Sequence, residues 1–274
     1  MRHKRVPAYT FTVEFPAPLD IPASLEIFRR TGDDGIDRWD GRVLVRTTRV
    51  TDTVVPFICT VLGTVDAPAL EVTVAHATHA AAVERAMQTM FVTAPEALAA
   101  LIAIDPVIAR LELRYPGLRP VLQSDFLTAL IRAISAQQVN LQWATTTRRR
   151  LAEAFGGQHT LGPHQVFSLT AARLATVDVA ALRALQFTTR KAEYIIALAT
   201  AVATGTLDLA ALRDQPAVDH GVEVRVVLDV VDVPVHVVVE PARRDPHEVP
   251  VVPAHTHDRA ILQVSGSPRE RARS

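Results

Sequence analysis

Apolar and polar residues alternate over residues 9–15, where aromatic residues and valine are separated by threonine and glutamate. A period of two residues is typical of a β-strand with one buried face. Three further segments share a strand-like pattern: residues 43–47, 54–62 and 70–74. Three segments carry helix signals: the residues after Pro22, residues 78–91 and the residues after Pro95. Strands flanked by helices predict an α+β fold, with an antiparallel sheet in a mixed α/β domain over residues 1–115.

The spacing of apolar residues becomes helical from about residue 118. One continuous apolar stripe is formed by Phe126, Leu127, Leu130, Ile131 and Ile134, and Ser124 or Asp125 can cap that helix. Asn140 is a good cap for the next helix, which is expected to stop at Gly156-Gly157. Further helices are expected over residues 171–176 and 179–185, from Thr188 or Thr189 to Gly205, and from residue 207. These short helices predict a compact all-α domain over residues 116–218.

Residues 219–274 follow neither pattern. Their long alternating stretch uses valine as nearly its only apolar residue, and from Gly221 onward there is no Phe, Tyr, Trp, Met, Lys or Asn. A core packed to natural density needs side chains of varied shape. We therefore expect this valine- and arginine-rich tail not to be natively folded.

The composition is that of a globular protein, with 274 residues of which 49% are hydrophobic and 21% charged. No uninterrupted apolar run approaches the roughly 20 residues that a membrane span needs. The basic start lacks the apolar segment of a secretory signal, and the single cysteine, Cys59, excludes an internal disulfide framework. We expect a cytoplasmic protein without membrane contact, in which Cys59 is a small buried apolar residue.

The formal net charge of zero hides a local asymmetry. Residues 106–200 contain eleven basic and five acidic residues, a net of six positive charges. Such a segment can hold phosphates, and it can equally be a solvated arginine-rich surface, so charge alone leaves both interpretations open.

Sequence signals for other chemistry are weak. His76 and His79 have the spacing of a metal pair, but no third ligand lies nearby in the sequence, so no metal site is expected. The signatures GxSxG, GxxxxGK[ST] and GxGxxG are absent. From the residues alone the chain is a two-domain protein with a basic helical half.

One segment carries a more specific signal. Residues 125–140 read DFLTALIRAISAQQVN and are followed by LQWATTTRRRLAEAFGG. This segment resembles the helical core of the helix–hairpin–helix DNA glycosylases, specifically the DNA-3-methyladenine glycosylase II family. The resemblance extends over about 215 residues, and its other blocks are PGLRP, LRALQFTTRKAEYIIALA, GTLDLAAL, FTVEFPAPLD and GIDRWDGRVLVRT.

The resemblance implies a hydrolase, a DNA N-glycosylase of base excision repair. Such an enzyme flips a damaged nucleotide out of double-stranded DNA and hydrolyses the N-glycosidic bond of an alkylated base such as 3-methyladenine. A carboxylate stabilises the oxocarbenium-like sugar while water completes the cleavage. The resemblance implies that no metal and no organic cofactor is needed, and we expect a monomer.

The resemblance also assigns DNA-binding residues. In the family, the turn after the first core helix inserts a side chain into the minor groove, in the space that the flipped base leaves. The matching position is Gln138, with Gln137 beside it; the alternative is that the two glutamines only cap the helix end. Arg148, Arg190 and Lys191 are the further residues that we expect to bind DNA.

The chain departs from the family after about Val218. Family members continue with a Gly-hydrophobic-Gly hairpin that holds a phosphate, a tryptophan and a catalytic aspartate. Here only Gly221 and Gly266 follow Gly205, and no tryptophan follows Trp143. The later aspartates are in none of the expected contexts: Asp229, Asp232, Asp245 and Asp258. We therefore assign no catalytic residue and describe the helical glycosylase domain as incomplete.

Two explanations for the tail stay open, a reading-frame shift in a GC-rich gene and a genuinely diverged sequence. A hairpin and a downstream aspartate encoded in another frame would support the first. For the whole chain, the main hypothesis is a glycosylase with little or no excision activity. The alternatives are a non-catalytic duplex-DNA-binding remnant of the family and a chain whose helical domain cannot close its core.

Overall fold

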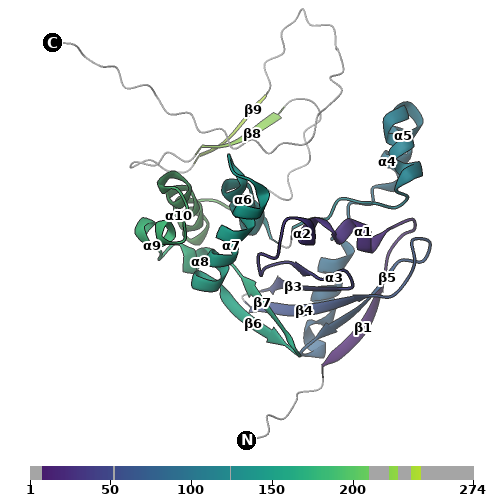
Figure 1. Cartoon of the computed structure of the whole chain (residues 1–274), viewed down its shortest axis with the longest axis horizontal. Helices are drawn as coiled ribbons and strands as arrows, with labels where there is room; N and C mark the ends of the chain where they lie inside the picture. Colours follow the sequence, from purple (N-terminus) through teal and green to yellow (C-terminus); the bar gives the residue numbers. More distant parts are fainter. Residues whose placement is uncertain (1–7, 52, 124, 210–221, 228–235, 242–274) are drawn as a thin grey trace, which may run out of the picture. The chain divides into compact units, whose positions relative to one another are not determined.

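The computed structural model describes residues 8–51, 53–123, 125–209, 222–227 and 236–241 (Figure 1). The chain divides into two compact units, Met1–Thr170 and Ala171–Ser274, each of which is described by itself. The predicted domain boundary at residues 115/116 lies within the first unit, and the boundaries at 115/116 and 218/219 stay predictions.

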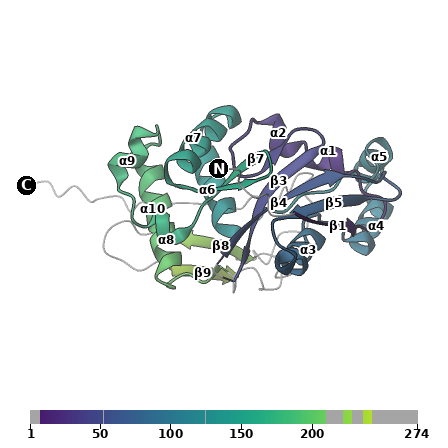
Figure 2. The same ribbon diagram turned by 90° about the horizontal axis from the view of Figure 1, so that it is seen from below.

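The first unit contains a five-stranded antiparallel sheet, which confirms the predicted α+β class (Figure 2). Its strand order is β1-β5-β4-β3-β2. The strands are β1 (Tyr9–Glu14), β2 (Arg38–Trp39), β3 (Val43–Val50), β4 (Thr53–Val61) and β5 (Ala69–Val74). Four of the five strands were predicted from their alternating pattern. The two-residue β2 is too short to show such a pattern.

Short helices complete the core around this sheet. They are α1 (Ile21–Leu25), α2 (Ile27–Arg30), the 3-10 helix η1 (Ala77–His79) and α3 (Ala80–Gln88). Val83 and Met87 of α3 are buried, and Cys59 of β4 lies fully buried with its sulfur 3.8 Å from that of Met87. The prediction that Cys59 is a buried apolar residue is thus confirmed.

Two helices of the first unit bury none of their residues: α4 (Pro95–Ile104) and α5 (Pro106–Arg114). Each begins with proline in its first turn, where the missing N–H costs nothing. Apolar side chains on both helices are exposed, including Ile104 and Leu113.

The helices α6 (Phe126–Ala136) and α7 (Leu141–Phe155) begin where the sequence predicted. The Asp125 side chain accepts the Thr128 N–H at 2.8 Å, and the Asn140 side chain accepts the Trp143 N–H at 2.8 Å. Leu127, Leu130, Ile131 and Ile134 form the buried stripe, whereas Phe126 at its start is 42% exposed. Thus Asp125, rather than Ser124, is the cap that the described residues support.

A β-hairpin follows α7, where the sequence analysis expected no strand. It consists of β6 (Gly157–Leu161) and β7 (His164–Ser168), paired antiparallel. Gly162, with φ +58°, forms the turn, and Val166 and Ser168 of β7 are buried while Phe167 between them is partly exposed. The Phe167 N–H donates to the Gly35 carbonyl at 2.8 Å, so the hairpin is held by a loop more than a hundred residues earlier. The sequence analysis assigned no element between Gly157 and Ser168, and it missed this hairpin because a distant contact holds it.

The second unit contains α8 (Ala171–Leu174), α9 (Val179–Ala184), α10 (Thr189–Ala203) and the antiparallel strands β8 (Val222–Val227) and β9 (His236–Pro241). Asp178 caps α9 and Thr188 caps α10. Gly205 follows α10 with φ +75°, as the sequence analysis expected of a helix stop. The helix expected from residue 207 lies largely outside the described residues. So does most of the tail, and its lack of a native fold stays a prediction.

Among the helices described here, none has both the length and the apolar character that a membrane crossing requires.

Candidate nucleic-acid interface

The turn between α6 and α7 contains both glutamines that the sequence analysis singled out. Gln137 ends α6 in an extended conformation and is half-buried, while Gln138 is exposed. Gln138 has φ +56°, in the left-handed region that a residue with a Cβ enters at a cost of about 1–2 kcal/mol. The turn therefore holds an exposed glutamine in a conformation that favours glycine.

The first turn of α7 exposes apolar side chains directly after these glutamines. Leu141 is 55% and Trp143 38% exposed. The Arg150 guanidinium lies 5.4 Å from the centroid of the Trp143 ring. An aromatic ring with an adjacent guanidinium can stack on bases and attract phosphates at once, because stacking and charge act on different parts of a nucleotide.

The three consecutive arginines of α7 have three different environments. Arg149 is exposed and pairs with Glu153 at 2.9 Å, one helical turn along. Arg150 lies over Trp143, as described above. Arg148 is only 7% exposed, so its environment is internal.

Arg148 is bonded within the first unit on all sides of its guanidinium. Its Nε donates to Asp34 Oδ2 at 3.1 Å, its Nη1 to Ser135 Oγ at 3.0 Å and its Nη2 to Thr145 Oγ1 at 3.0 Å. A guanidinium held by three internal acceptors is not available to a DNA phosphate. The expectation that Arg148 contacts DNA therefore needs correction: its position supports an indirect role.

Arg148 belongs to a larger group, here called the buried ionic cluster, whose members are Asp34, Asp37, Arg46, Arg132 and Arg148. Arg132 pairs with Asp34 at 2.8 Å and with Asp37 at 2.5 Å, and Arg46 pairs with Asp37 at 2.5 Å. Three guanidinium groups thus surround two carboxylates. Polar oxygens of Gln123, Leu122, Ser135 and Thr145 accept the remaining donors. Burial of these charges is tolerated because each is paired and hydrogen-bonded.

The cluster shifts the ionisation of its members. Burial by itself raises the pKa of the Asp37 carboxyl, but Arg46 and Arg132 outweigh that effect and hold the pKa below its ordinary value of 3.8. Burial lowers the pKa of Arg132, yet Asp37 and Asp34 outweigh it, so this pKa is raised. For Arg148 burial dominates and lowers the pKa, although Asp34 opposes it.

Glycines allow the acidic loop to approach the helices closely. Gly32 has φ +103°, and a Cβ there would lie 3.2 Å from Thr145 Cγ2 of α7. Gly35 has φ +79°, and a Cβ there would lie 3.1 Å from the Phe167 ring of β7. Asp34 lies between these glycines, which explains how a loop before β2 delivers its carboxylate to two helices.

Comparison with known proteins finds a family that resembles the chain over these helices. Residues 131–265 match the family described as HhH-GPD superfamily base excision DNA repair protein. The matched range includes most of α6 and all of α7, and it continues past residue 218 into the tail that the sequence analysis set apart.

Two relatives of this chain carry the name that the resemblance suggested. DNA-3-methyladenine glycosylase 2 of Escherichia coli (strain K12) is 33% identical over 106 residues, which is 39% of this chain and 38% of that protein. DNA-3-methyladenine glycosylase of Bacillus subtilis (strain 168) is 30% identical over 107 residues, 38% of this chain and 34% of that protein. The chain thus spans little more than a third of the length of either relative.

Solved structures show that the likeness in fold is broader. A 3-methyladenine DNA-glycosylase from Archaeoglobus fulgidus superposes with a TM-score of 0.64 at 17% identity, over 75% of this chain and 70% of that chain. The apo-form of a Clostridium acetobutylicum 8-oxoguanine glycosylase/lyase gives a TM-score of 0.55 at 12% identity, over 78% of this chain and 72% of that chain. The chain therefore shares the fold of these solved structures over most of its length.

Arg190 and Lys191 lie in the second unit, at the start of α10. Arg190 is exposed, and its Nε donates to the Tyr194 hydroxyl at 2.5 Å. Burial lowers the pKa of Lys191, whose backbone N–H donates to the Thr188 capping oxygen at 3.3 Å. The structure thus brings Gln137, Gln138 and Arg148 together in one unit. Arg190 and Lys191 form a separate pair, and direct DNA binding by Gln137, Gln138, Arg190 and Lys191 stays a prediction.

The structure adds functional candidates that the sequence analysis missed: Asp34, Arg132 and Ser135. Arg132 was noted only as one charge of the basic segment. Arg132 is not on the apolar face that Leu127, Leu130, Ile131 and Ile134 form, so the helical pattern gave no signal of its internal ion pairs. Nothing in the sequence indicated which acidic residues would pair with it.

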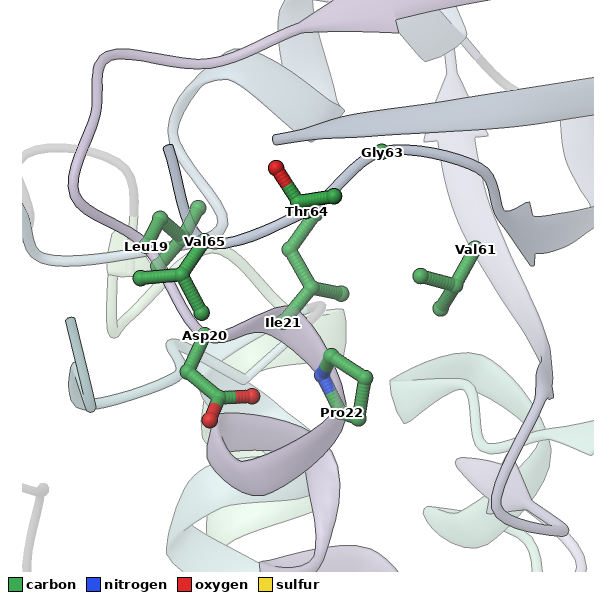
Figure 3. A pocket seen from close by; sticks show the side chains of 8 residues that line it. All are labelled: Leu19, Asp20, Ile21, Pro22, Val61, Gly63, Thr64 and Val65. Atoms are coloured by element: carbon green, nitrogen blue, oxygen red, sulfur yellow. The ribbon is translucent and has the colours of Figure 1, made fainter. Parts of the chain in front are cut away.

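Other candidate sites offer less chemistry. A cavity of about 140 Å³ lies beside α1, and Figure 3 shows the side chains that line it. Its carboxylate, Asp20, already accepts the Ala23 N–H at 2.9 Å. In the described part of the chain, no group of three His, Cys, Asp or Glu is arranged as a metal site. The four late aspartates, Asp229, Asp232, Asp245 and Asp258, lie outside the described residues.

Proposed function

We propose that this chain binds double-stranded DNA that contains alkylated bases, and that it acts in base excision repair through the turn between α6 and α7. In this proposal Gln138 enters the minor groove and occupies the space of a flipped nucleotide, with Gln137 beside it. The HhH-GPD match, the names of the relatives and the glycosylase fold support the class of function. In this proposal the protein is a cytoplasmic monomer that binds the DNA of the nucleoid.

One observation carries the proposal: an exposed glutamine held at φ +56° between two capped helices. Glycine would adopt this conformation without strain. A residue that only needed to turn the chain gains nothing from a long amide side chain here. A residue that fills a vacated base position needs that size, and the amide can bond to base edges.

The neighbouring side chains suit the same task. Leu141 and Trp143 are exposed apolar groups next to the turn. Stacking of a base on an aromatic ring contributes about 1–3 kcal/mol. Arg149 and Arg150 add positive charge on the same helix, which favours the phosphate backbone.

Excision is expected to be weak or absent in this chain. The family's hairpin, tryptophan and aspartate pattern is missing from its sequence after Val218. Without a carboxylate near the sugar cation the barrier rises, and each ~1.4 kcal/mol reduces the rate tenfold. The same missing pattern favours the second candidate function, a duplex-DNA-binding remnant with no catalysis.

Binding to duplexes with and without an abasic site tests the proposal. The measurement compares the affinity of the full chain for an intact duplex and for the same duplex with a stable abasic-site analogue. We expect the chain to bind the abasic duplex more tightly than the intact duplex, and to lose affinity steeply as salt rises. The preference for the abasic duplex should be lost in Gln138→Ala. A matched control is Gln186→Ala, which changes another exposed glutamine with positive φ. Equal binding of both duplexes by the native chain would refute the assignment.

A further inference from the structure

We propose that a set of buried positioning residues fixes the conformation of the α6–α7 turn and thereby controls the recognition of an abasic site by Gln138. These residues are Asp34, Arg132, Ser135 and Arg148. The proposal rests on the proposed function for its effect on DNA. The four residues, here called the positioning cluster, touch no DNA themselves. Their hydrogen bonds join the two helices on either side of the turn.

One carboxylate oxygen holds both helices. Asp34 Oδ2 accepts from Arg132 Nη2 at 2.8 Å and Nε at 3.1 Å, and from Arg148 Nε at 3.1 Å. Arg132 belongs to α6 and Arg148 to α7. A shift of either helix along the other would break these bonds, so the acidic loop fixes their relative register.

A serine extends this connection to the end of α6. Arg148 Nη1 donates to Ser135 Oγ at 3.0 Å, and Ser135 Oγ donates to the Arg132 carbonyl at 2.9 Å. Ser135 is 1% exposed and lies three residues before Gln138. The last turn of α6 is thus bonded to the middle of α7, and the glutamine turn lies between the two bonded points.

The turn needs such a constraint because its conformation is locally unfavourable. Gln138 has φ +56°, and the isolated backbone would favour a negative φ for glutamine. Strained residues persist where the surrounding structure determines them. The positioning cluster is buried and paired, so its bonds are stronger than surface bonds and can supply that constraint.

The test uses a variant that removes the hydrogen bonds of one hydroxyl group and leaves the charges intact. Ser135→Ala deletes the oxygen between Arg148 and the end of α6, while Asp34 and Thr145 still hold Arg148. The matched control is Ser24→Ala. Ser24 is also buried, and its Oγ bonds to the Asp20 carbonyl at 2.6 Å and the Arg119 N–H at 3.0 Å, outside the cluster.

The first readout needs no DNA. Hydrogen exchange of the full-length protein is measured on a peptide that covers residues 137–140. Each variant is measured at the same number of degrees below its own melting temperature. Under these conditions we expect faster exchange of this peptide in Ser135→Ala than in Ser24→Ala. Unchanged exchange in Ser135→Ala would overturn the positioning role, whatever the chain does with DNA.

The second readout is the preference for a duplex with an abasic-site analogue over an intact duplex. We expect Ser135→Ala to reduce this preference by about threefold to tenfold, a range typical of coupled neighbouring groups, and Ser24→Ala to leave it unchanged. In a Gln138→Ala background, Ser135→Ala should have no further effect. An equal loss in both backgrounds would show that Ser135 does not act through Gln138 and would overturn the proposal. Absence of any preference in the native chain would refute the proposed function instead, and the exchange result would still decide the positioning role.

Discussion

At the scale of single residues, Gln138 combines an unfavourable backbone conformation with an exposed, long side chain. Backbone strain at an exposed position is expected where the side chain has a task, because a purely structural turn would use glycine. The same argument separates the two interpretations of the glutamines that the sequence left open. A helix-capping role predicts a loss of stability on substitution by glycine, and a DNA-binding role does not.

Gln138→Gly should therefore leave the free energy of unfolding within about 1 kcal/mol of the native value, or raise it, because relief of strain offsets the greater freedom of the unfolded chain. The preference of this variant for the abasic duplex over the intact duplex should be lost. Chemical denaturation and duplex titration measure the two effects. Gln186→Gly, at φ +74°, is the control for the backbone effect and should keep DNA binding. A clearly destabilised Gln138→Gly with normal DNA binding would favour the capping role.

His159 supplies a residue-scale prediction on pH. Its Nε2 lies 2.9 Å from Ser168 Oγ, and burial lowers its pKa below the ordinary value of 6.5. The folded protein therefore resists protonation that the unfolded chain accepts. The resulting stability is complete above about pH 6.5 and declines as pH falls through the folded pKa.

In His159→Gln this decline should be absent, so the fall in free energy of unfolding between pH 7.5 and 5.5 should be smaller than in the native protein. Urea unfolding at the two pH values measures it. His76→Gln, at an exposed histidine, is the control and should retain the native pH dependence. An identical pH dependence in native protein and His159→Gln would show that burial of this ring has no energetic effect.

At the scale of elements, the sequence predicted what local chemistry determines. The caps Asp125 and Asn140 and the stop at Gly156 were readable because a cap and its partner lie within three or four residues. The β6–β7 hairpin and the Asp34–Arg148 pair were not. Asp34 and Arg148 are 114 residues apart in the chain, and no local pattern identifies a partner at that distance.

The cap of α7 gives an element-scale prediction. Asn140→Ala removes the acceptor of the Trp143 N–H, which should lower the free energy of unfolding by about 1 kcal/mol. Because the cap lies two residues after Gln138, recognition of the abasic site should weaken as well. Thr188→Ala removes the corresponding cap of α10 and should leave the preference for the abasic duplex closer to that of the native chain. Comparable DNA defects in both variants would argue against a special role of the α6–α7 turn.

At the scale of the whole molecule, the buried ionic cluster joins the predicted N-terminal domain to the helices that carry the glutamines. This connection explains why residues 1–170 form one compact unit, although the sequence predicted a boundary at 115/116. Removing one partner of such a cluster leaves a charge without compensation, which typically costs about 3–5 kcal/mol.

The cluster also predicts how the protein responds to acid. The pKa of Asp37 is lowered in the folded state, so its contribution to stability is present above the ordinary value of 3.8 and is lost as pH falls through the folded pKa. Thermal unfolding between pH 6 and pH 3 should therefore show a steep loss of stability below about pH 4. The slope should be smaller in Asp37→Asn, where folding permits the measurement, and native in the exposed control Asp66→Asn. A native slope in Asp37→Asn would exclude Asp37 as its source.

The central proposal is that this chain retains a surface that binds duplex DNA and lacks the chemistry that releases a base. The most direct test incubates the full chain with an alkylated duplex at a concentration where binding is complete, and measures free 3-methyladenine over time. We predict saturated, salt-sensitive binding without release of the base. Release that depends on the chain, at a rate well above that of the DNA alone, would contradict the claim.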